Sequence, residues 1–473
     1  MNSFPVSRSQ TCEWRADKAA GMKLFLTSLG CDKNLVDSEE MTGLLSERGI
    51  TFTDQESEAE VIIVNTCAFI GDAKEESIQT ILSLAEYKTQ AGNGGKCRAL
   101  IVCGCLGQRY QEEVLKELPE VDAVVGTMAY PLVASAIDRV LSGEKGILIC
   151  EAAAGTKKPG LSGKRILSTG GHYAFLKIAE GCDKRCTYCI IPYLRGGYRS
   201  YPMEELVKEA ERLAELGVKE LILIAQETTV YGLDLYGEKK LPALLKELAG
   251  IEGIRWLRLM YCYPEEITEE LIDTIRTEPK VCHYLDIPIQ HVSDRILRNM
   301  GRKTDASSIG SLIERLRKEI PDIAIRTTLI TGFPGETEED FRTLYNFVDE
   351  TEFERLGVFP YSEEEGTKAA ELADQVPQEV RESRRDEIML LQQEIAFDRA
   401  KEQLGRRLTV FVEGKLADED VYVGRTYMDA PDVDGLLFFT SDRDYMSGDF
   451  ARVVVTGAKD YDLIGETEHE SSE

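Results

Sequence analysis

The segment YAFLKIAEGCDKRCTYCII, residues 173–191, joins an apolar run to three cysteines that fall within eight positions. Their spacing would place Cys182, Cys186 and Cys189 on one face of a helix, but charged residues lie between them and Pro192 follows. Proline disrupts helix interiors, so a loop fits this stretch better than a buried helix. The segment therefore predicts a strand that delivers three thiols to the loop behind it.

Strand and helix patterns alternate six times over residues 173–361, beginning with this strand. Six such units favour a partial (βα)6 barrel of the TIM type, which we place at residues 172–400. The strand candidates are YAFLKIAE, KELILIAQ, IRWLRLMYC, HYLDIPIQ, AIRTTLITG and RLGVFPYS, and a long polar helix pattern starts at Gln378. In such barrels the loops behind the strands form the active face, and the cysteine loop is one of them.

The chain before the barrel has the pattern of an open parallel α/β domain, at residues 22–140. Its strand candidates are KLFLTSLG, VIIVNTC, RALIVCGC and DAVVG, with helix patterns at 35–49 and 73–88. We expect residues 1–21 to be a disordered extension. Residues 151–171 are rich in Gly, Ser and Lys and are typical of a linker.

The last part of the chain, residues 405–467, contains strand patterns without a helix among them. They are LTVFVEG, YVGRT, LLFFT and ARVVVTGA. This pattern predicts a small β-barrel. Residues 468–473 form an acidic tail that we expect to be disordered.

Composition restricts the class of protein. No apolar run is long enough to cross a bilayer, and residues 1–21 lack the apolar segment of a signal peptide. We therefore expect a cytoplasmic protein with no membrane partner. Twelve cysteines in such a chain indicate metal or redox chemistry rather than disulfides. We expect five of them, in or beside apolar runs, to be small buried residues: Cys97, Cys103, Cys150, Cys262 and Cys282.

The dense triad offers three thiols and no nearby fourth ligand. Structural zinc sites need four ligands, and no other cysteine or histidine lies close by in sequence. His172 precedes the strand and would lie at its far end. Three thiolates suit a 4Fe–4S cluster that leaves one iron open to a ligand.

A dispersed triad is predicted in the first domain. Cys31, Cys67 and Cys105 each follow a strand candidate, and the carboxyl ends of parallel strands share one sheet edge. Helices start at the same edge, which lowers the pKa of thiols there and favours thiolate ligands. Cys105 is preferred to Cys103 because it lies beyond Gly104, beside the next helix start. The alternative is three unrelated buried cysteines.

The dense motif, with Tyr188 at its aromatic position, resembles the signature of radical S-adenosylmethionine enzymes. The resemblance implies that the open iron chelates S-adenosylmethionine and that cleavage of its C–S bond gives a radical that abstracts hydrogen. It assigns cofactor contacts to Gln226 and Glu227 behind the second strand, although the family's glycines are missing there.

The string TLITGFPGE behind the fifth strand resembles the segment beside the cofactor's adenosine, so Gly332 and Gly335 are further candidate cofactor-binding residues. Glycine there would allow close backbone approach. The alternative is a plain turn into a helix, with Thr337 and Asp340 forming a capping box.

Three strings of the first domain, SLGCDKN, NTCAF and GCLGQR, resemble the N-terminal domain of methylthiotransferases, and the last segment resembles their TRAM barrel. The resemblance covers residues 22–466. It implies a radical S-adenosylmethionine enzyme with two 4Fe–4S clusters, one generating the radical and one carrying sulfur. An electron donor and a sulfur donor are further implied partners.

Within that family, SLGCDKNLVDSE, IPYLRGGYRS, AQETTVYG and LDIPIQHVSDRILRNMGR resemble the ribosomal-protein branch, the RimO type. This branch implies a methylthio group placed on the β-carbon of an aspartate of small-subunit ribosomal protein twelve. A cationic anchor for that carboxylate is expected, with Arg195, Arg199 and Lys177 as candidates.

Charge points the same way. The chain carries a formal charge of −28, and residues 405–473 hold 7 Lys and Arg against 16 Asp and Glu, a net of −9. Such a surface repels phosphate and attracts a basic protein, which argues against a nucleic acid as direct substrate. A merely solvated acidic surface is the alternative. The remaining alternatives for function are a tRNA adenosine methylthiotransferase and a non-catalytic iron–sulfur carrier.

Overall fold

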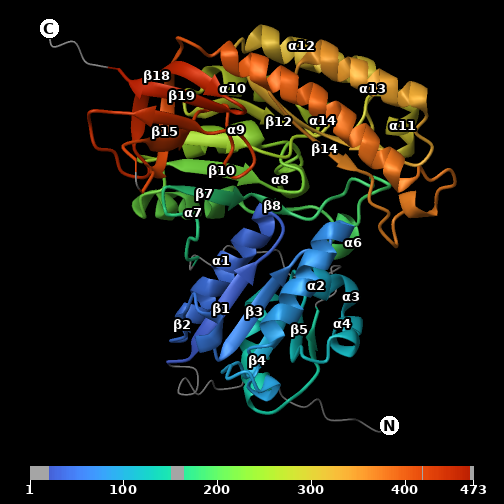
Figure 1. Ribbon diagram of the computed structural model, residues 1–473, viewed down its shortest axis with the longest axis vertical. Helices are drawn as coiled ribbons and strands as arrows, with labels where there is room; N and C mark the ends of the chain where they lie inside the picture. Colours follow the sequence, from blue (N-terminus) through green and yellow to red (C-terminus); the bar gives the residue numbers. More distant parts are fainter. Residues whose placement is uncertain (1–20, 151–164, 418, 469–473) are drawn as a thin grey trace, which may run out of the picture.

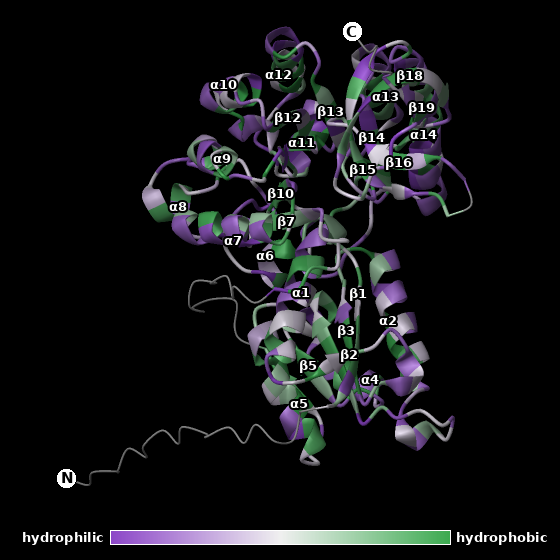
Figure 2. Cartoon of the chain, turned by 90° about the vertical axis from the view of Figure 1, so that its left-hand side faces the viewer, coloured by the Kyte–Doolittle hydropathy of each residue, from purple (hydrophilic) through white to green (hydrophobic). Residues whose placement is uncertain are grey.

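The computed structural model describes residues 21–150, 165–417 and 419–468, which fold into three consecutive domains (Figure 1). Predictions for residues 1–20, 151–164 and 469–473 lie outside the described residues. Figure 2 shows hydrophobic residues along the strands of the first domain and hydrophilic residues on the helices around them. Among the described helices, none has both the length and the apolar character to cross a membrane.

The first domain is the expected open parallel sheet with flanking helices. Its sheet has the order β2-β1-β3-β4-β5-β6, and every pairing is parallel. Its elements are β1 (Lys23–Ser28), α1 (Asp32–Ser46), β2 (Thr51–Phe52), β3 (Val61–Thr66), α2 (Gly71–Ala85), β4 (Ala99–Gly104), α3 (Cys105–Tyr110), α4 (Glu112–Glu117), β5 (Ala123–Val125), α5 (Val133–Leu141) and β6 (Ile147–Ile149). The sheet continues past the predicted boundary at residue 140. Its last strand, β6, was not predicted because an edge strand of three residues is too short to give a period-two pattern.

The second domain confirms the partial barrel. Its parallel strands have the order β14-β13-β12-β11-β10-β7, and β14 does not pair with β7 in the described sheet. They are β7 (Tyr173–Lys177), β10 (Glu220–Ile224), β11 (Trp256–Leu259), β12 (Val281–Asp286), β13 (Ala324–Thr331) and β14 (Arg355–Pro360). The short pair β8 (Ala179–Glu180) and β9 (Arg199–Ser200) closes the base of the cysteine loop.

The helices of this domain are α6 (Ile191–Leu194), α7 (Met203–Glu215), α8 (Leu233–Tyr236), α9 (Leu241–Ala249), α10 (Glu269–Thr277), α11 (Asp294–Asn299), α12 (Ala306–Glu319), α13 (Glu338–Thr351) and α14 (Gln378–Lys401). The longer helices cover the outside of the barrel and fill its main core with their apolar faces, whereas α6 packs against the first domain. The capping box of Thr337 and Asp340 is confirmed at the start of α13. The predicted long polar helix is α14, which lies along β14 (Figure 1).

The third domain is a closed barrel of five strands in the order β15-β16-β17-β19-β18. They are β15 (Arg407–Lys415), β16 (Tyr422–Arg425), β17 (Leu437–Thr440), β18 (Phe450–Lys459) and β19 (Asp462–Thr467). Four were predicted. The fifth, β19, has the sequence DLIGET, in which acidic residues and a glycine replace the apolar and β-branched residues expected of a strand.

Part of the acidic charge of the third domain is used inside the protein. Glu220 of β10 accepts hydrogen bonds of 2.7 Å from Arg258 and from Arg425 of the third domain, and all three side chains are buried. Burial opposes ionisation of Glu220, but Arg425 and Arg258 outweigh it and hold its pKa below the ordinary value. Glu413 of the small barrel pairs with Arg425 and with His172, at the far end of β7 as expected.

Replacing Glu220 with Gln should weaken the attachment of the small barrel, because two buried guanidinium groups lose their counter-ion. Breaking a buried pair typically costs about 3–5 kcal/mol. Trp256, which packs against Phe411 and Phe450 of the small barrel, reports the change through its fluorescence during urea unfolding. A Trp14→Phe background removes the chain's other tryptophan.

The matched control is Glu252→Gln, an exposed position. Equal urea midpoints for Glu220→Gln and this control would contradict the assigned role of Glu220.

Candidate active site

The dispersed triad lies at one edge of the first sheet. Cys31 precedes α1, Cys67 directly follows β3, and Cys105 opens α3. The strands before them, β1, β3 and β4, are neighbours in the sheet. A Cβ atom on Gly30, beside Cys31, would lie 2.9 Å from the Cys67 sulfur. The thiols of Cys31 and Cys67 both raise the pKa of Cys105. The three thiols are therefore near one another. Cys103 points instead into the apolar core of the domain.

The sequence GCDK occurs at residues 30–33 and at residues 181–184, and its glycine has the same structural role in both places. Gly30 and Gly181 both adopt left-handed backbone conformations, with φ of +86° and +79°. A Cβ atom on Gly30 would lie 2.9 Å from the Cys67 sulfur, and one on Gly181 would lie 2.3 Å from the Gly197 carbonyl oxygen. In both loops only glycine allows the backbone to turn so tightly in front of the cysteine.

The dense triad lies on the loop between β8 and α6. Cys182 and Cys186 are buried and Cys189 is half-buried. The Cys182 amide donates to the Gly196 carbonyl, and the Cys189 amide donates to the Cys186 carbonyl. The pairing of β8 with β9 fixes both ends of the loop, which brings the three thiols to the carboxyl end of the barrel.

Each triad offers three thiols, the ligands that iron–sulfur clusters use. Within the described residues, no group of three or more His, Cys, Asp or Glu side chains is placed to hold a metal ion. In a 4Fe–4S cluster each thiolate binds a different iron, so three thiols around a common space suffice when one iron stays open. Two such groups of thiols are present, one in each domain. The assignment of the six cysteines as ligands stays a prediction.

The expected lowering of thiol pKa at helix starts is wrong for the protein chain alone. Burial raises the pKa of Cys105 to about 12, and burial likewise raises the pKa of Cys67 and Cys182. Desolvation outweighs the helix dipole at these positions. Bound iron would favour the thiolate form, because ligand thiols lose their protons on metal binding.

Two predicted cofactor contacts lie beside the dense triad. Glu227 is buried, accepts a 2.8 Å hydrogen bond from Thr229, and has its pKa raised to about 7 by burial. Lys184 of the cysteine loop lies 3.8 Å from it. The Gln226 amide nitrogen donates to Glu180, while its buried amide oxygen has no hydrogen-bond partner among the described residues.

The other three predicted cofactor contacts, Gly332, Gly335 and Tyr188, differ in how much room their surroundings leave for a ligand. Gly332 and Gly335 both have positive φ, but a Cβ on Gly332 would lie 2.2 Å from the Arg381 side chain of α14. Gly332 is therefore also required for packing of α14. A Cβ on Gly335 would meet only the Arg295 guanidinium, at 3.5 Å. Tyr188 lines the cavity described below.

Arg302 was missed by the sequence analysis. It is buried, its guanidinium lies 4.2 Å from the centre of the Tyr263 ring, and Tyr263 lies 3.7 Å from the Cys186 sulfur. Two of its nitrogens, Nε and Nη1, have no hydrogen-bond partner among the described residues. Buried donors are normally paired, so these two nitrogens are available to an acceptor on a ligand. Arg302 ends the string LDIPIQHVSDRILRNMGR, but nothing in that string sets it apart from a surface arginine.

A buried ion-pair network joins the two triads. Arg195 donates to Glu180 at 2.9 Å and to Asp37 of α1 at 3.2 Å. Its other arm donates to Asn34 at 2.5 Å and lies 3.8 Å from the Cys105 sulfur. Lys177 bridges the same two carboxylates. One cluster of charges therefore fixes the first domain against the barrel.

This network corrects the search for a substrate anchor. Arg195 and Lys177 are fully buried and bound to carboxylates of the protein itself, so neither is free to take a substrate carboxylate. Arg199 donates to the carbonyls of Arg195 and Gly197, and its buried Nε has no hydrogen-bond partner among the described residues, so it stays a candidate. Proximity in sequence to the cysteine loop suggested all three, but it did not show that carboxylates of the protein face Arg195 and Lys177.

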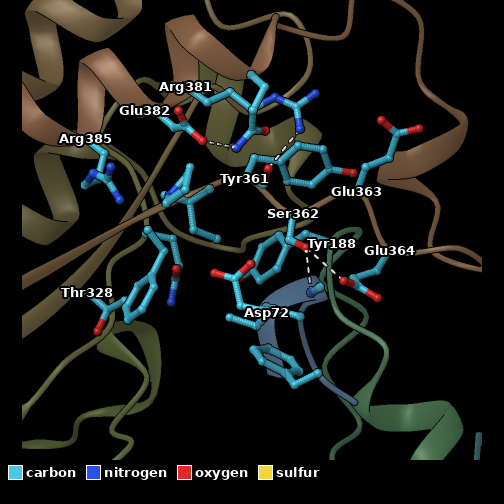
Figure 3. Close-up of a pocket in the computed structure, with 18 residues that line it drawn as sticks. Asp72, Tyr188, Thr328, Tyr361, Ser362, Glu363, Glu364, Arg381, Glu382 and Arg385 are labelled. Atoms are coloured by element: carbon cyan, nitrogen blue, oxygen red, sulfur yellow. Dashed lines mark hydrogen bonds between the residues drawn. The ribbon is translucent and has the colours of Figure 1, made fainter. Parts of the chain in front are cut away.

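A cavity of about 640 Å³ opens between the first domain and the barrel (Figure 3). The start of α2 forms one wall, and the ends of β13 and β14 with the start of α14 form the other. Tyr188, between two cysteines of the dense triad, reaches it from the barrel side. Phe69, two residues after Cys67, reaches it from the first domain.

Comparison with known proteins gives three matching family models. Residues 23–126 match the uncharacterized protein family UPF0004, residues 176–348 match the radical SAM superfamily, and residues 404–467 match the TRAM domain. They coincide with the three domains of the structure.

Close relatives share almost the full length of the chain. The ribosomal protein uS12 methylthiotransferase RimO of Lachnoclostridium phytofermentans is 58% identical over 94% of this chain and 100% of its own. The proteins of the same name from Acetivibrio thermocellus and Pelotomaculum thermopropionicum are 53% and 51% identical, over 95% and 94% of this chain and 99% of each relative.

Among solved structures, the radical S-adenosylmethionine methyltransferase TsrM of Kitasatospora setae matches with a TM-score of 0.53 at 14% identity. The match covers 71% of this chain and 72% of that chain. The likeness confirms the radical SAM fold of the central domain.

Glu40 of α1 gives a pH test of the buried interface between the first domain and the barrel. Burial raises its pKa to about 7, and Tyr130 donates to it. The unfolded chain ionises Glu40 at its ordinary, lower pKa, so the free energy of unfolding falls as pH rises from about 4.5 to about 7. Glu40→Gln should remove this loss and stabilise the protein at pH 8 by up to about 3 kcal/mol, at 1.36 kcal/mol per pKa unit.

Urea midpoints of both proteins at pH 5 and pH 8 measure the effect. If the wild type is no less stable relative to Glu40→Gln at pH 8 than at pH 5, the buried, neutral state of Glu40 is contradicted.

Proposed function

Because the chain belongs to the RimO family of ribosomal protein uS12 methylthiotransferases, we propose that it is a transferase that places a methylthio group on ribosomal protein uS12. The target within uS12 is an aspartate, modified at its β-carbon. The observation that carries the proposal is the presence of two thiol triads in different domains, linked by Arg195. Its guanidinium lies 3.8 Å from the Cys105 sulfur and pairs with Glu180, which stands just before the loop of the dense triad. A single-cluster protein would need only one triad.

In this proposal each triad holds one 4Fe–4S cluster: Cys31, Cys67 and Cys105 in the first domain, and Cys182, Cys186 and Cys189 in the barrel. When bound, the clusters and S-adenosylmethionine supply the radical and the methylthio group. Among the cofactor contacts, Glu227 and Gln226 bind the methionyl amine, which the free oxygen of Gln226 supports. Arg302 offers its two unpaired nitrogens to an oxygen of the bound ligand.

Other cofactor contacts surround the adenosine. Gly335 leaves room for it, because only the Arg295 side chain lies near its missing Cβ atom. Tyr188 presents its ring to the cavity from between two cysteines.

The substrate is a basic protein rather than a nucleic acid. The net charge of −9 on residues 405–473 repels phosphate. Three of its carboxylates, those of Glu413, Asp429 and Asp434, form ion pairs with arginines within the protein. We place the reaction in the cytoplasm, where ribosomal proteins are found. The electron and the sulfur come from external donors.

A tRNA adenosine methylthiotransferase is the rival with the same chemistry. Thr229 and His291, which lie in the strings AQETTVYG and LDIPIQHVSDRILRNMGR that resemble the RimO type, have structural roles in this chain. Thr229 donates to Glu227, and the buried His291 ring accepts hydrogen bonds from the amides of Val292 and Ser293. A non-catalytic carrier, the second rival, leaves the cavity and the unpaired atoms of Arg302 unexplained.

The proposal is tested by anaerobic incubation of the reconstituted protein with S-adenosylmethionine, a reductant, uS12 and bulk tRNA together. Mass spectrometry should find the methylthio group on an aspartate of uS12. Cys31→Ala and Cys186→Ala should each abolish it, because each removes a ligand of a different triad.

Cys150→Ala, a half-buried cysteine outside both triads, is the control and should keep activity. Modification of tRNA in place of uS12 would overturn the substrate. Absence of any S-adenosylmethionine cleavage would favour the carrier.

A further inference from the structure

The mouth of the cavity carries acidic side chains without counter-ions. Among the described residues, Asp72 and Glu363 have no ion pair, and Glu382 accepts only a hydrogen bond from the uncharged Gln378. Figure 3 shows these three carboxylates on different walls of the cavity, from α2, from the loop after β14 and from α14. Unpaired carboxylates facing one opening attract cations to it.

The other charges that line the cavity are already paired or are turned to the protein. Glu364 pairs with Lys74 at 2.8 Å and with Arg109 at 2.6 Å, and Arg385 pairs with Asp386. Arg381 is buried and donates to the carbonyls of Val376 and Tyr361. Arg381 has no carboxylate partner among the described residues, but its side chain is buried. The three unpaired carboxylates therefore outnumber it at the mouth.

Two exposed aromatic rings flank the same opening. Phe69 is 39% exposed and Phe359 is 51% exposed, which is unusual for rings that could be buried. Rings of this kind bind aliphatic side-chain stems and can also attract a cation to the ring face. Lysine and arginine combine an apolar stem with a charged end.

We propose that the mouth formed by Asp72, Glu363 and Glu382 is the docking site for a cationic segment of the substrate protein, with Lys or Arg beside the residue to be modified. The inference rests on the proposed function and deepens it by assigning the recognition surface. The cationic side chains lie on the carboxylates and rings of the mouth. The target side chain then extends inward, past Phe69 and Tyr188, to the space between the triads.

Charge reversal tests this directly. The double variant Asp72→Lys/Glu363→Lys, fully reconstituted, should bind purified uS12 with a Kd at least about ten-fold weaker than the wild type. The control, Glu112→Lys/Glu394→Lys, makes the same change of net charge at exposed positions on α4 and α14. Glu394 lies about 18 Å along α14 from Glu382, at 1.5 Å per residue.

A charge swap gives the reciprocal test. A uS12 variant in which the Lys and Arg residues beside the target aspartate are changed to Glu should bind poorly to the wild type and regain affinity for the double variant. If that double variant does not fold, the milder Glu363→Gln at an exposed loop position replaces it, with a smaller loss of affinity expected.

The outcomes separate the two levels of proposal. Equal binding of uS12 to the double variant and to its control, while the wild type modifies uS12, would overturn the docking site alone. Failure of the wild type to modify uS12 would overturn the proposed function. Tighter tRNA binding by the double variant, together with unchanged uS12 binding, would show that the acidic mouth only repels phosphate.

Discussion

The arrangement of the site depends on four buried charges at the interface of the first two domains. Asp37 on α1 and Glu180 on β8 share Lys177 and Arg195, all of them out of contact with solvent. Burial raises the cost of ionising Glu180, yet the two cations outweigh it and keep its pKa below the ordinary value. Removing any one partner would leave an uncompensated charge, which typically costs several kcal/mol. The network therefore allows one relative orientation of the domains.

That orientation explains why the two triads can act together. Asn34, three residues after Cys31, accepts from Arg195, and the same guanidinium lies beside Cys105. The loop of the dense triad starts at Gly181, immediately after Glu180. A second contact, between Glu364 and the pair Lys74 and Arg109, holds the opposite side of the cavity. The substrate cavity is thus formed by both domains, and neither domain contains it alone.

Local patterns were sufficient to predict the strands of the barrel, the parallel sheet before it and the convergence of Cys31, Cys67 and Cys105. These follow from periodicity and from the shared edge of parallel strands. Residue roles and strands that depend on partners distant in sequence were missed or wrongly predicted. Arg302 became visible only through its unpaired nitrogens, and Lys177 proved to be an interface residue because Asp37 lies 140 positions away. The edge strand β6 and the acidic strand β19 pair with neighbours that their own sequences do not indicate.

The central claim is that each triad holds its own cluster, one in the first domain and one in the barrel. The most direct measurement is the iron content of the anaerobically reconstituted protein and of two triple variants. These are Cys31→Ala/Cys67→Ala/Cys105→Ala and Cys182→Ala/Cys186→Ala/Cys189→Ala. Two 4Fe–4S clusters require about eight irons in the wild type and about four in each triple variant. A triple variant that keeps the full iron content, or a wild type with about four irons, would contradict the account.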